Sequence, residues 1–265
     1  MTAANDQRPE FEARGVIKVP GLISNADARG ARDLICDLAA EHAVYSSTGW
    51  SRSESRFGID KSFRAAMNAL NHAADFPDLI SKSIVDMAET LIGEPVSIMP
   101  PGQQILFTLP GAAAWFVPHD VWHVDMPRLG ALGAPGVQIF VILKDLEPKG
   151  GGTLVLAGSH RFLNTSRVIR SKKIKQLLGK EPYFRALFDG GRAPVTDLNE
   201  TVAAVDGVDL EVVELTGDAG DVYVMDLRAL HTLAPNARDT ARIMLTCRLP
   251  RAAIADQWQI AETRE

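Results

Sequence analysis

The chain of 265 residues is organised around one stretch, Pro118-His119-Asp120-Val121-Trp122-His123-Val124-Asp125-Met126. Its apolar residues predict a β-strand over 121–125, and successive side chains of a strand point to opposite faces. His123 and Asp125 would then project to the same side. Two histidines and one carboxylate on one face form the facial triad that holds non-heme Fe(II). The stretch therefore offers two of three metal ligands, and the third has to come from elsewhere in the chain.

A second stretch, Gly220–Asp226, predicts another strand and leads to His231. An adjacent strand can bring His231 back to the first stretch as the third ligand. Eleven residues later comes Arg242, on the next predicted strand. A guanidinium inside a barrel is unfavourable unless it meets a carboxylate, which it binds through two parallel hydrogen bonds. An acidic cosubstrate would supply that carboxylate. The alternative is that Arg242 lies on an ordinary solvated strand face, which it shares with Met244, Thr246 and Arg248.

Short apolar runs separated by Gly and Pro fill the chain from Pro95 onward and predict about eight strands. The runs are Val96–Met99, Gln103–Leu109, Val121–Asp125, Val137–Leu143, Thr153–Leu156, Leu210–Leu215, Asp221–Asp226 and Ala241–Leu249. This pattern favours a mainly β fold with flanking helices, either a sandwich or a double-sheet jelly roll. Residues 166–206 form an insertion with a basic first half instead of a strand. We predict a single domain over 1–265, helical over about 1–94, with the β core over about 95–250.

The part of the chain before Pro95 predicts helices and one strand. The strand is Gly15–Pro20, and the helices are one from Ser24 or Asn25 to about His42, Ser62–Ala73, and Pro77–Ile92, the last stopped by Gly93. Tyr45–Lys61 is polar and rich in Ser and Arg. We expect a loop there, which is either a mobile lid or plain surface.

Composition limits the class of protein. Hydrophobic residues make up 46% and charged residues 23% of the chain, as in ordinary globular proteins. A net charge of −5 gives no attraction to nucleic acid or to an acidic membrane, and no apolar run approaches the roughly 20 residues that span a bilayer. The two cysteines, Cys36 and Cys247, suit a reducing cytosol, and the N-terminus is no secretory signal. We predict a cytoplasmic protein with a small-molecule substrate and without nucleic-acid or membrane partners; a homo-oligomer is compatible with the sequence.

Four motifs follow one another along the chain. They are His123-x-Asp125, Leu143–Leu154 with its Gly150-Gly151-Gly152-Thr153 segment, Gly158-Ser159-His160-Arg161, and His231-x4-Asn236-x5-Arg242. A single His-x-Asp is weak, but the ordered set resembles the phytanoyl-CoA dioxygenase (PhyH) family. These are Fe(II)- and 2-oxoglutarate-dependent oxygenases on a double-stranded β-helix. The resemblance runs from about Gly15 to Leu249 and is tightest between Trp122 and Arg161.

The resemblance implies a set of catalytic metal ligands for Fe(II): His123, Asp125 and His231. It also implies that Arg242 pairs with the distal carboxylate of 2-oxoglutarate. Thr153 and Gln104 are further candidates for the cosubstrate pocket, and ordinary turn chemistry is the alternative for Thr153. O2 would take the remaining position on the metal, 2-oxoglutarate would yield succinate and CO2, and the substrate would be oxidised, most simply by hydroxylation.

Other oxidative outcomes use the same ligands in this family, including desaturation, epimerisation and cyclisation. Halogenation is disfavoured, because related halogenases replace the carboxylate with a small residue and this chain keeps Asp125. Residues that contact the substrate have no motif and are predicted by position alone, on the segments 45–61, 112–120 and 166–206. The candidates are Phe107, Trp115, Phe116 and His119. For His119, a metal ligand and a plain surface residue are the alternatives.

Two other functions compete with an oxygenase. A non-catalytic, cupin-like binding module would be favoured by a broken ligand set, and the set is complete. A hydrolase or isomerase could use the same triad with Zn(II), but it leaves Arg242 unexplained. The run Gly150-Gly151-Gly152 is not a phosphate-binding loop, because no Gly-x4-Gly-Lys-[Ser/Thr] pattern surrounds it.

Overall fold

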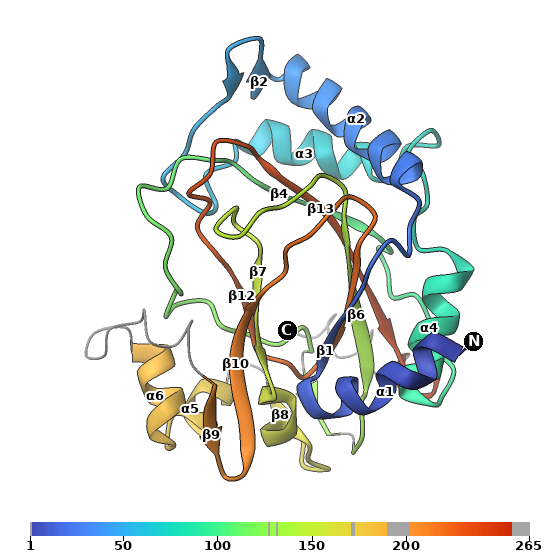
Figure 1. The fold of residues 1–265 in the computed structure, drawn as a ribbon, viewed down its shortest axis with the longest axis vertical. Coiled ribbons are helices and arrows are strands. Elements are labelled where there is room, and N and C mark those ends of the chain that lie inside the picture. The colour runs from blue at the N-terminus through green and yellow to red at the C-terminus, as the bar shows by residue number, and fades with distance from the viewer. Residues whose placement is uncertain (1, 127, 131, 171–172, 190–201, 256–265) are drawn as a thin grey trace.

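Two antiparallel β-sheets lie face to face in the computed structural model of the chain, which describes residues 2–126, 128–130, 132–170, 173–189 and 202–255 (Figure 1). In the larger sheet the strands lie in the order β1 (Val16–Val19), β11 (Val222–Asp226), β6 (Gly136–Ile142), β13 (Arg242–Pro250) and β4 (Gln104–Thr108). In the smaller sheet the order is β12 (His231–Leu233), β7 (Thr153–Ala157), β10 (Val208–Glu214) and β9 (Ala203–Val205). This arrangement confirms the predicted jelly roll.

The space between the two sheets is filled by side chains that alternate along each strand. On β13, Met244 belongs to the cluster between the sheets together with Phe140 of β6. Its neighbours Ile243 and Leu245 belong to a different cluster, on the outer face of the larger sheet. Because side chains two residues apart share a face, Arg242 points into the same interior as Met244.

Helices cover the outer faces of both sheets (Figure 1). The larger sheet packs against α1 (Thr2–Arg14), α2 (Asn25–Glu41), α3 (Lys61–Leu70) and α4 (Lys82–Ile92). The smaller sheet packs against α5 (Ile174–Leu178) and α6 (Pro182–Asp189). Two short ribbons are also present, β2 (Tyr45–Ser46) with β3 (Gly49–Trp50) and β5 (Arg128–Leu129) with β8 (Ile169–Arg170), as is a 3-10 helix, η1 (Ser159–Leu163). Within the described residues, no helix is long and apolar enough to cross a membrane.

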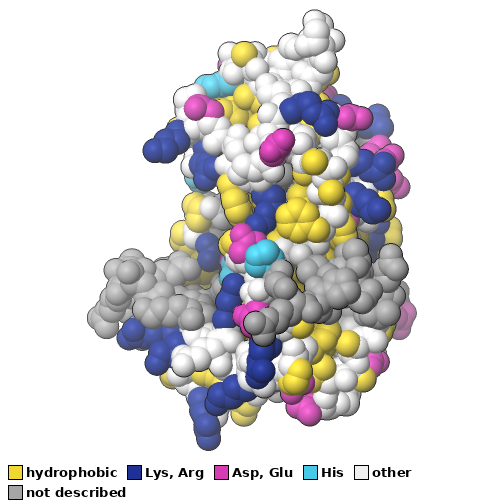
Figure 2. Space-filling view, turned by 90° about the vertical axis from the view of Figure 1, so that its left-hand side faces the viewer, with side chains coloured by type: hydrophobic (Ala, Val, Ile, Leu, Met, Phe, Trp, Pro, Cys, Tyr) yellow, Lys and Arg dark blue, Asp and Glu magenta, His cyan; other side chains and the backbone are white. Residues whose placement is uncertain are grey.

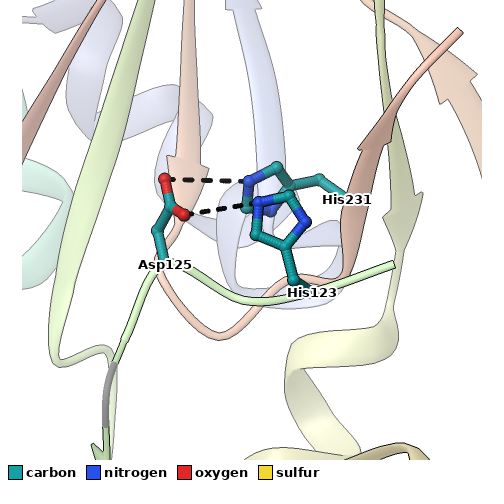
Figure 3. Close-up of side chains that lie close together, drawn as sticks. All are labelled: His123, Asp125 and His231. Carbon is teal, nitrogen blue, oxygen red and sulfur yellow. Dashed lines mark ion pairs between the residues drawn. The ribbon is translucent and has the colours of Figure 1, made fainter. Parts of the chain in front are cut away.

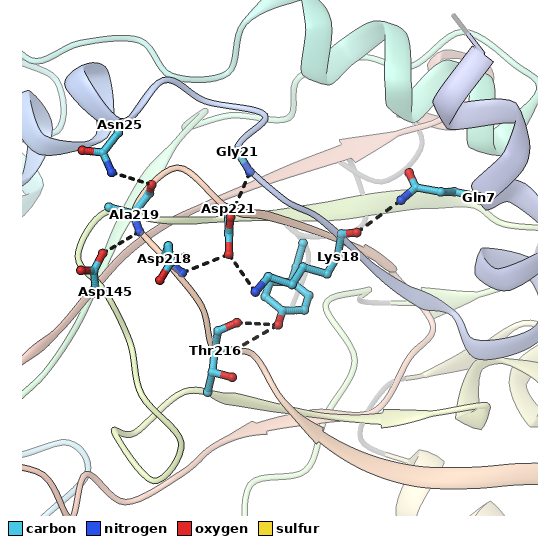
Figure 4. Close-up of polar contacts among 10 residues, drawn as sticks. Gln7, Lys18, Gly21, Asn25, Asp145, Thr216, Asp218, Ala219 and Asp221 are labelled. Carbon is cyan, nitrogen blue, oxygen red and sulfur yellow. Dashed lines mark hydrogen bonds and ion pairs between the residues drawn. The ribbon is translucent and has the colours of Figure 1, made fainter.

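Asp221 fastens the N-terminal segment to the larger sheet (Figure 4). Its carboxylate accepts hydrogen bonds from the backbone N–H groups of Gly21 at 2.9 Å and Asp218 at 3.0 Å, and it pairs with the Lys18 ammonium at 2.7 Å. Burial alone would raise the pKa of Asp221, but Lys18 and the two N–H groups hold that pKa below its usual range. A charged contact therefore reinforces the β1–β11 ladder.

The helical part of the prediction is largely correct, with shifted ends. Ser24 caps α2 by accepting a hydrogen bond from the Asp27 N–H at 3.1 Å. The helix predicted over Pro77–Ile92 begins only at Lys82, and Gly93, with a φ of +79°, ends it as expected. The helix α1 is not predicted, because the apolar residues of 2–14 do not recur at helical spacing.

Two predicted strands are wrong. Of the run that starts at Val96, only that residue forms a bridge, and within Val121–Asp125 only His123 does so, to His231. Val121 has a φ of +57°, a left-handed conformation that β-branched residues rarely adopt, and this interrupts extended pairing. The metal-ligand stretch is therefore a loop with one bridge.

Both segments predicted without strands contain secondary structure. The segment 45–61 includes the β2–β3 ribbon, and the insertion 166–206 includes β8, α5, α6 and β9. Residues 171–172 and 190–201 of the insertion lie outside the described residues.

Candidate metal centre

A backbone bridge brings the two histidines of the predicted triad together (Figure 3). The His123 N–H donates to the His231 carbonyl at 3.1 Å, and the His231 N–H donates to the His123 carbonyl at 3.0 Å. The two imidazole centroids lie 4.2 Å apart. Asp125, two residues further along the loop, turns its carboxylate toward both rings. The common orientation expected from a strand is thus achieved by a single bridge and a bent loop.

The ligand atoms of the triad converge on one point. His123 Nε2 lies 3.5 Å from Asp125 Oδ1, and His231 Nε2 lies 3.8 Å from Asp125 Oδ2. One ligand atom from each of the three residues lies within 4.8 Å of the others. Metal–ligand bonds to imidazole nitrogen and carboxylate oxygen are about 2.0–2.2 Å long, so one ion can be reached by atoms at these separations.

The backbone fixes which nitrogen of each imidazole faces the carboxylate. His123 Nδ1 lies 2.8 Å from the Val121 carbonyl, and His231 Nδ1 lies 3.1 Å from the Ala229 carbonyl. A carbonyl only accepts, so each Nδ1 carries the proton and donates it. Each Nε2 then faces Asp125 and can give its lone pair to an ion when it carries no proton. This second hydrogen bond is the arrangement that orients metal-binding histidines in proteins.

The protonation states of His231 and Asp125 also suit a cation. Burial lowers the pKa of His231 to about 4, against the opposing charge of Asp125, so this imidazole is neutral at pH 7. Burial alone would raise the pKa of Asp125, but the His231 and His123 imidazoles hold it well below its usual range. For His123, burial is outweighed by the hydrogen bond and charge of Asp125, which raise its pKa. A neutral imidazole beside a carboxylate is the form in which both bind a metal.

The triad lies between the barrel interior and the surface. The exposed fraction of the side chain is 47% for His123, 24% for Asp125 and 6% for His231, so the site opens outward on the His123 side. The Phe140 ring lies beneath it, with its centroid 6.5 Å from that of His231. Figure 2 shows one face of the molecule, with exposed imidazole and carboxylate side chains near its middle and several Lys and Arg side chains toward its lower end.

Arg242 is buried inside the barrel, with 3% of its surface exposed. The solvated-face alternative is therefore wrong. Its Nη1 donates to Thr153 Oγ1 at 3.3 Å, and its Nε has no hydrogen-bond partner among the described residues. Burial lowers the pKa of Arg242 to about 10, and the charge of Glu214 opposes this effect. The guanidinium is thus charged at pH 7, without an ion-pair partner in the described part of the chain.

The other cosubstrate and substrate candidates have different placements. Thr153 is buried and contacts Arg242, as the cosubstrate prediction requires. Gln104 is exposed, at the opposite end of β4 from the residue that pairs with Arg242. Phe107 lies on the outer face of β4, with its ring 5.3 Å from that of Phe63 on α3. This places Phe107 in the helix-covered core and gives it no contact with the barrel interior.

The remaining substrate candidates lie on the loop that leads into the triad. Trp115 is half-buried against the core of the smaller sheet, whereas Phe116 and His119 are exposed. Their role stays a prediction. One residue near the site had no signal in the sequence: Arg56, from the Ser- and Arg-rich segment, contacts the same loop at Asp120.

Comparisons with known proteins place the fold. No protein-family model and no curated protein matches the sequence. Among solved structures, SnoK, a non-heme alpha ketoglutarate dependent carbocyclase from nogalamycin biosynthesis, is similar with a TM-score of 0.55 and 16% identity, over 93% of this chain and 83% of SnoK. AviO1 from Streptomyces viridochromogenes Tue57 has a TM-score of 0.55 and 17% identity, over 95% of each chain. EctD from S. alaskensis, solved with bound Fe, has a TM-score of 0.50 and 18% identity, over 94% of this chain and 76% of EctD. The chain therefore has the cupin-like jelly-roll fold of these proteins.

Proposed function

We propose that this protein is an Fe(II)- and 2-oxoglutarate-dependent dioxygenase of the PhyH type, which oxidises a small-molecule substrate with O2. The observation that carries the proposal is the pairing of two features in one barrel. His123, Asp125 and His231 present two imidazoles and a carboxylate to one point. Arg242 is buried in the same interior without a carboxylate partner in the described part of the chain.

The donor set suits Fe(II). Two histidines and one carboxylate would occupy one face of the ion and leave the opposite positions for a chelating cosubstrate and O2. With 2-oxoglutarate bound, an iron held here would activate O2, which is the oxidant both for converting the cosubstrate to succinate and CO2 and for oxidising the substrate. The hydrogen bonds from Nδ1 of His123 and His231 hold the two rings in place before any ion arrives.

Arg242 and Thr153 would hold the far end of the cosubstrate. A guanidinium binds a carboxylate through two parallel hydrogen bonds, and a buried guanidinium without one is unfavourable. Because Arg242 Nη1 already contacts Thr153 Oγ1, the hydroxyl is placed to assist at the same carboxylate. Binding of the cosubstrate carboxylate would explain why a charged side chain is buried at Arg242, which fold stability alone does not explain.

Hydroxylation is the simplest outcome, and the same triad is compatible with desaturation, epimerisation or cyclisation. SnoK, whose fold is similar, is a carbocyclase. A Zn(II) hydrolase gives no role to Arg242, and a non-catalytic module gives no role to the complete ligand set. The two cysteines, Cys36 and Cys247, are free, as suits the cytoplasmic location that we propose.

The test is a titration of 2-oxoglutarate into anaerobic, Fe(II)-loaded protein, monitored by the visible metal-to-ligand charge-transfer absorption. We expect a band in the wild type, no band in His123→Ala, and a much higher cosubstrate requirement in Arg242→Ala. Arg238→Ala is the matched control, because Arg238 is half-exposed and pairs with Glu147 outside the barrel. Iron binding without a band would refute the role of 2-oxoglutarate, and failure to bind iron would refute the metal centre.

A further inference from the structure

Arg56 makes two directed contacts from a side chain that is only 11% exposed. Its Nη1 donates to the Leu233 carbonyl at 2.8 Å, and its Nη2 donates to Asp120 Oδ1 at 2.5 Å. Its guanidinium also lies over the Phe57 ring, 5.2 Å from the centroid. A largely buried guanidinium that reaches a carboxylate and a carbonyl at once is held in one geometry, unlike an ordinary surface ion pair.

The two acceptors of Arg56 belong to the segments that carry the triad. Asp120 precedes His123 by three residues in the loop, and Leu233 follows His231 by two residues in β12. Besides the contacts among the triad residues, the two segments share a long hydrogen bond from Thr232 Oγ1 to the Asp120 carbonyl at 3.5 Å. Arg56 therefore joins both segments from outside the barrel.

A short covalent path links this contact to the orientation of His123. Asp120 is followed directly by Val121, whose carbonyl accepts the hydrogen bond from His123 Nδ1 at 2.8 Å. The His123 side chain is 47% exposed, so packing does little to hold its ring. Fixing Asp120 fixes the carbonyl that aims the Nε2 lone pair of His123 at the metal position.

Arg52 provides an internal comparison on the same segment. It forms an ion pair with Asp239 at 2.8 Å, but the side chains are 60% and 90% exposed and neither residue contacts a triad segment. Both arginines thus dock residues 51–58 on the rim of the barrel, together with the Ser53 N–H bond to the Pro110 carbonyl at 2.8 Å. Of these two arginines, Arg56 is the one that contacts the loop and β12.

We infer that Arg56 is a positioning residue of the metal centre, which holds the His123 loop and β12 at the separation and orientation that the ion requires. This inference rests on the proposed function. Lysine could replace one of its two contacts but not both, because the guanidinium presents several donors in a rigid fork. Loss of a partner that orients a metal ligand typically lowers metal affinity by roughly 10–100-fold.

The experiment measures Co(II) affinity by calorimetry and by the d–d absorption of the bound ion, in full-length protein without cosubstrate. We expect Arg56→Ala to weaken Co(II) binding roughly 10–100-fold and to alter the absorption of the bound ion. Arg56→Lys should recover part of the affinity. Arg52→Ala should stay within about twofold of the wild type, because exposed ion pairs contribute little. Circular dichroism at the titration temperature establishes that each variant is folded.

The outcomes separate this inference from the proposed function. If the wild type binds Co(II) and folded Arg56→Ala binds it equally well, Arg56 is not a positioning residue and the proposed function stands. If the wild type does not bind Co(II), both fail. Should Arg56→Ala not fold, Asp120→Asn removes the charged partner and keeps the shape of the side chain. Unchanged affinity and spectrum in that variant would likewise overturn the inference.

Discussion

Replacing Arg242 with methionine separates what this residue does for the cosubstrate from what it does for the fold. The Arg242 guanidinium is buried, donates to Thr153 Oγ1, and leaves its Nε without a hydrogen-bond partner in the described part of the chain. Burial lowers its pKa from the ordinary 12.5 to about 10, which corresponds to about 3 kcal/mol less favourable solvation of the charge. Methionine fills a similar volume without carrying a charge.

The expected gain in stability follows from three terms. Replacing buried charge with a well-packed apolar side chain often stabilises a protein by about 1–4 kcal/mol. The Thr153 hydroxyl loses one hydrogen bond, worth about 1 kcal/mol. Glu214 keeps the hydrogen bonds that it accepts from the N–H groups of Lys149 at 2.8 Å and Gly152 at 3.0 Å, so no carboxylate is left unsatisfied. We expect Arg242→Met without ligands to be about 1–2 kcal/mol more stable than the wild type, which raises the Tm by about 2–8 °C.

The assay is thermal and urea unfolding with and without Mn(II) and 2-oxoglutarate. A cosubstrate at about 100 times its Kd adds about 2.7 kcal/mol to the wild type and nothing to a variant that cannot bind it. Without ligands, Arg242→Met should therefore be more stable than the wild type. With Mn(II) and 2-oxoglutarate present, the wild type should be the more stable of the two. Arg52→Met, at an exposed arginine, is the control. It should change neither the stability without ligands nor the gain in stability when ligands are added. A variant that unfolds below the wild type without ligands, or that gains equally from 2-oxoglutarate, would refute the reasoning.

Three further changes test the site and its support. His231→Ala should weaken Co(II) binding by more than the roughly 100-fold expected from losing an orienting partner, as measured by calorimetry. Asp221→Asn should lose about 2 kcal/mol in urea unfolding at pH 7, because Lys18 and two N–H groups bind the charged form. Folding lowers the pKa of Asp221, so the stability that its carboxylate contributes is complete above about pH 4 and is lost as the pH falls through the pKa of the folded state. A stability difference between wild type and Asp221→Asn that persists unchanged at pH 2 would contradict this. Gly15→Ala should destabilise by more than about 1 kcal/mol, because Gly15 has a φ of +69° and a Cβ would lie 2.3 Å from His160 Nδ1; the added change His160→Ala should restore part of the loss.

Strands that run through the barrel were predictable because their pattern is continuous. The limits of β13 and β11 match the apolar runs within one residue. The direction of a side chain was harder to predict where both faces of a strand are covered. On β4, Phe107 faces the helices and Thr108 faces the interior, and both are buried. Composition alone does not distinguish two covered faces, which is why Phe107 was a plausible substrate contact in the sequence and is a core residue in the structure.

The residues of the candidate triad were predictable from the order of the motifs. The local backbone geometry around them was not. The alternating apolar residues around His123 are typical of a strand, and only the positive φ of Val121 shows why the chain bends there. Arg56 lies far from the motifs in sequence, and its partners Asp120 and Leu233 are set by how a polar segment docks on the barrel rim. Contacts of this kind depend on tertiary structure and leave no periodic signal.

The His123–His231 bridge joins two parts of the chain that are synthesised at different times. His123 and Asp125 leave the ribosome long before His231, which makes the bridge from β12, the strand that pairs with β7. A nascent chain that ends before β12 offers an ion two ligands on an unsupported loop, too few to hold it firmly. If the triad holds the proposed ion, its complete ligand set exists only once β12 has been made and bridged to the loop, so a bound ion would report that the second half of the domain is in place.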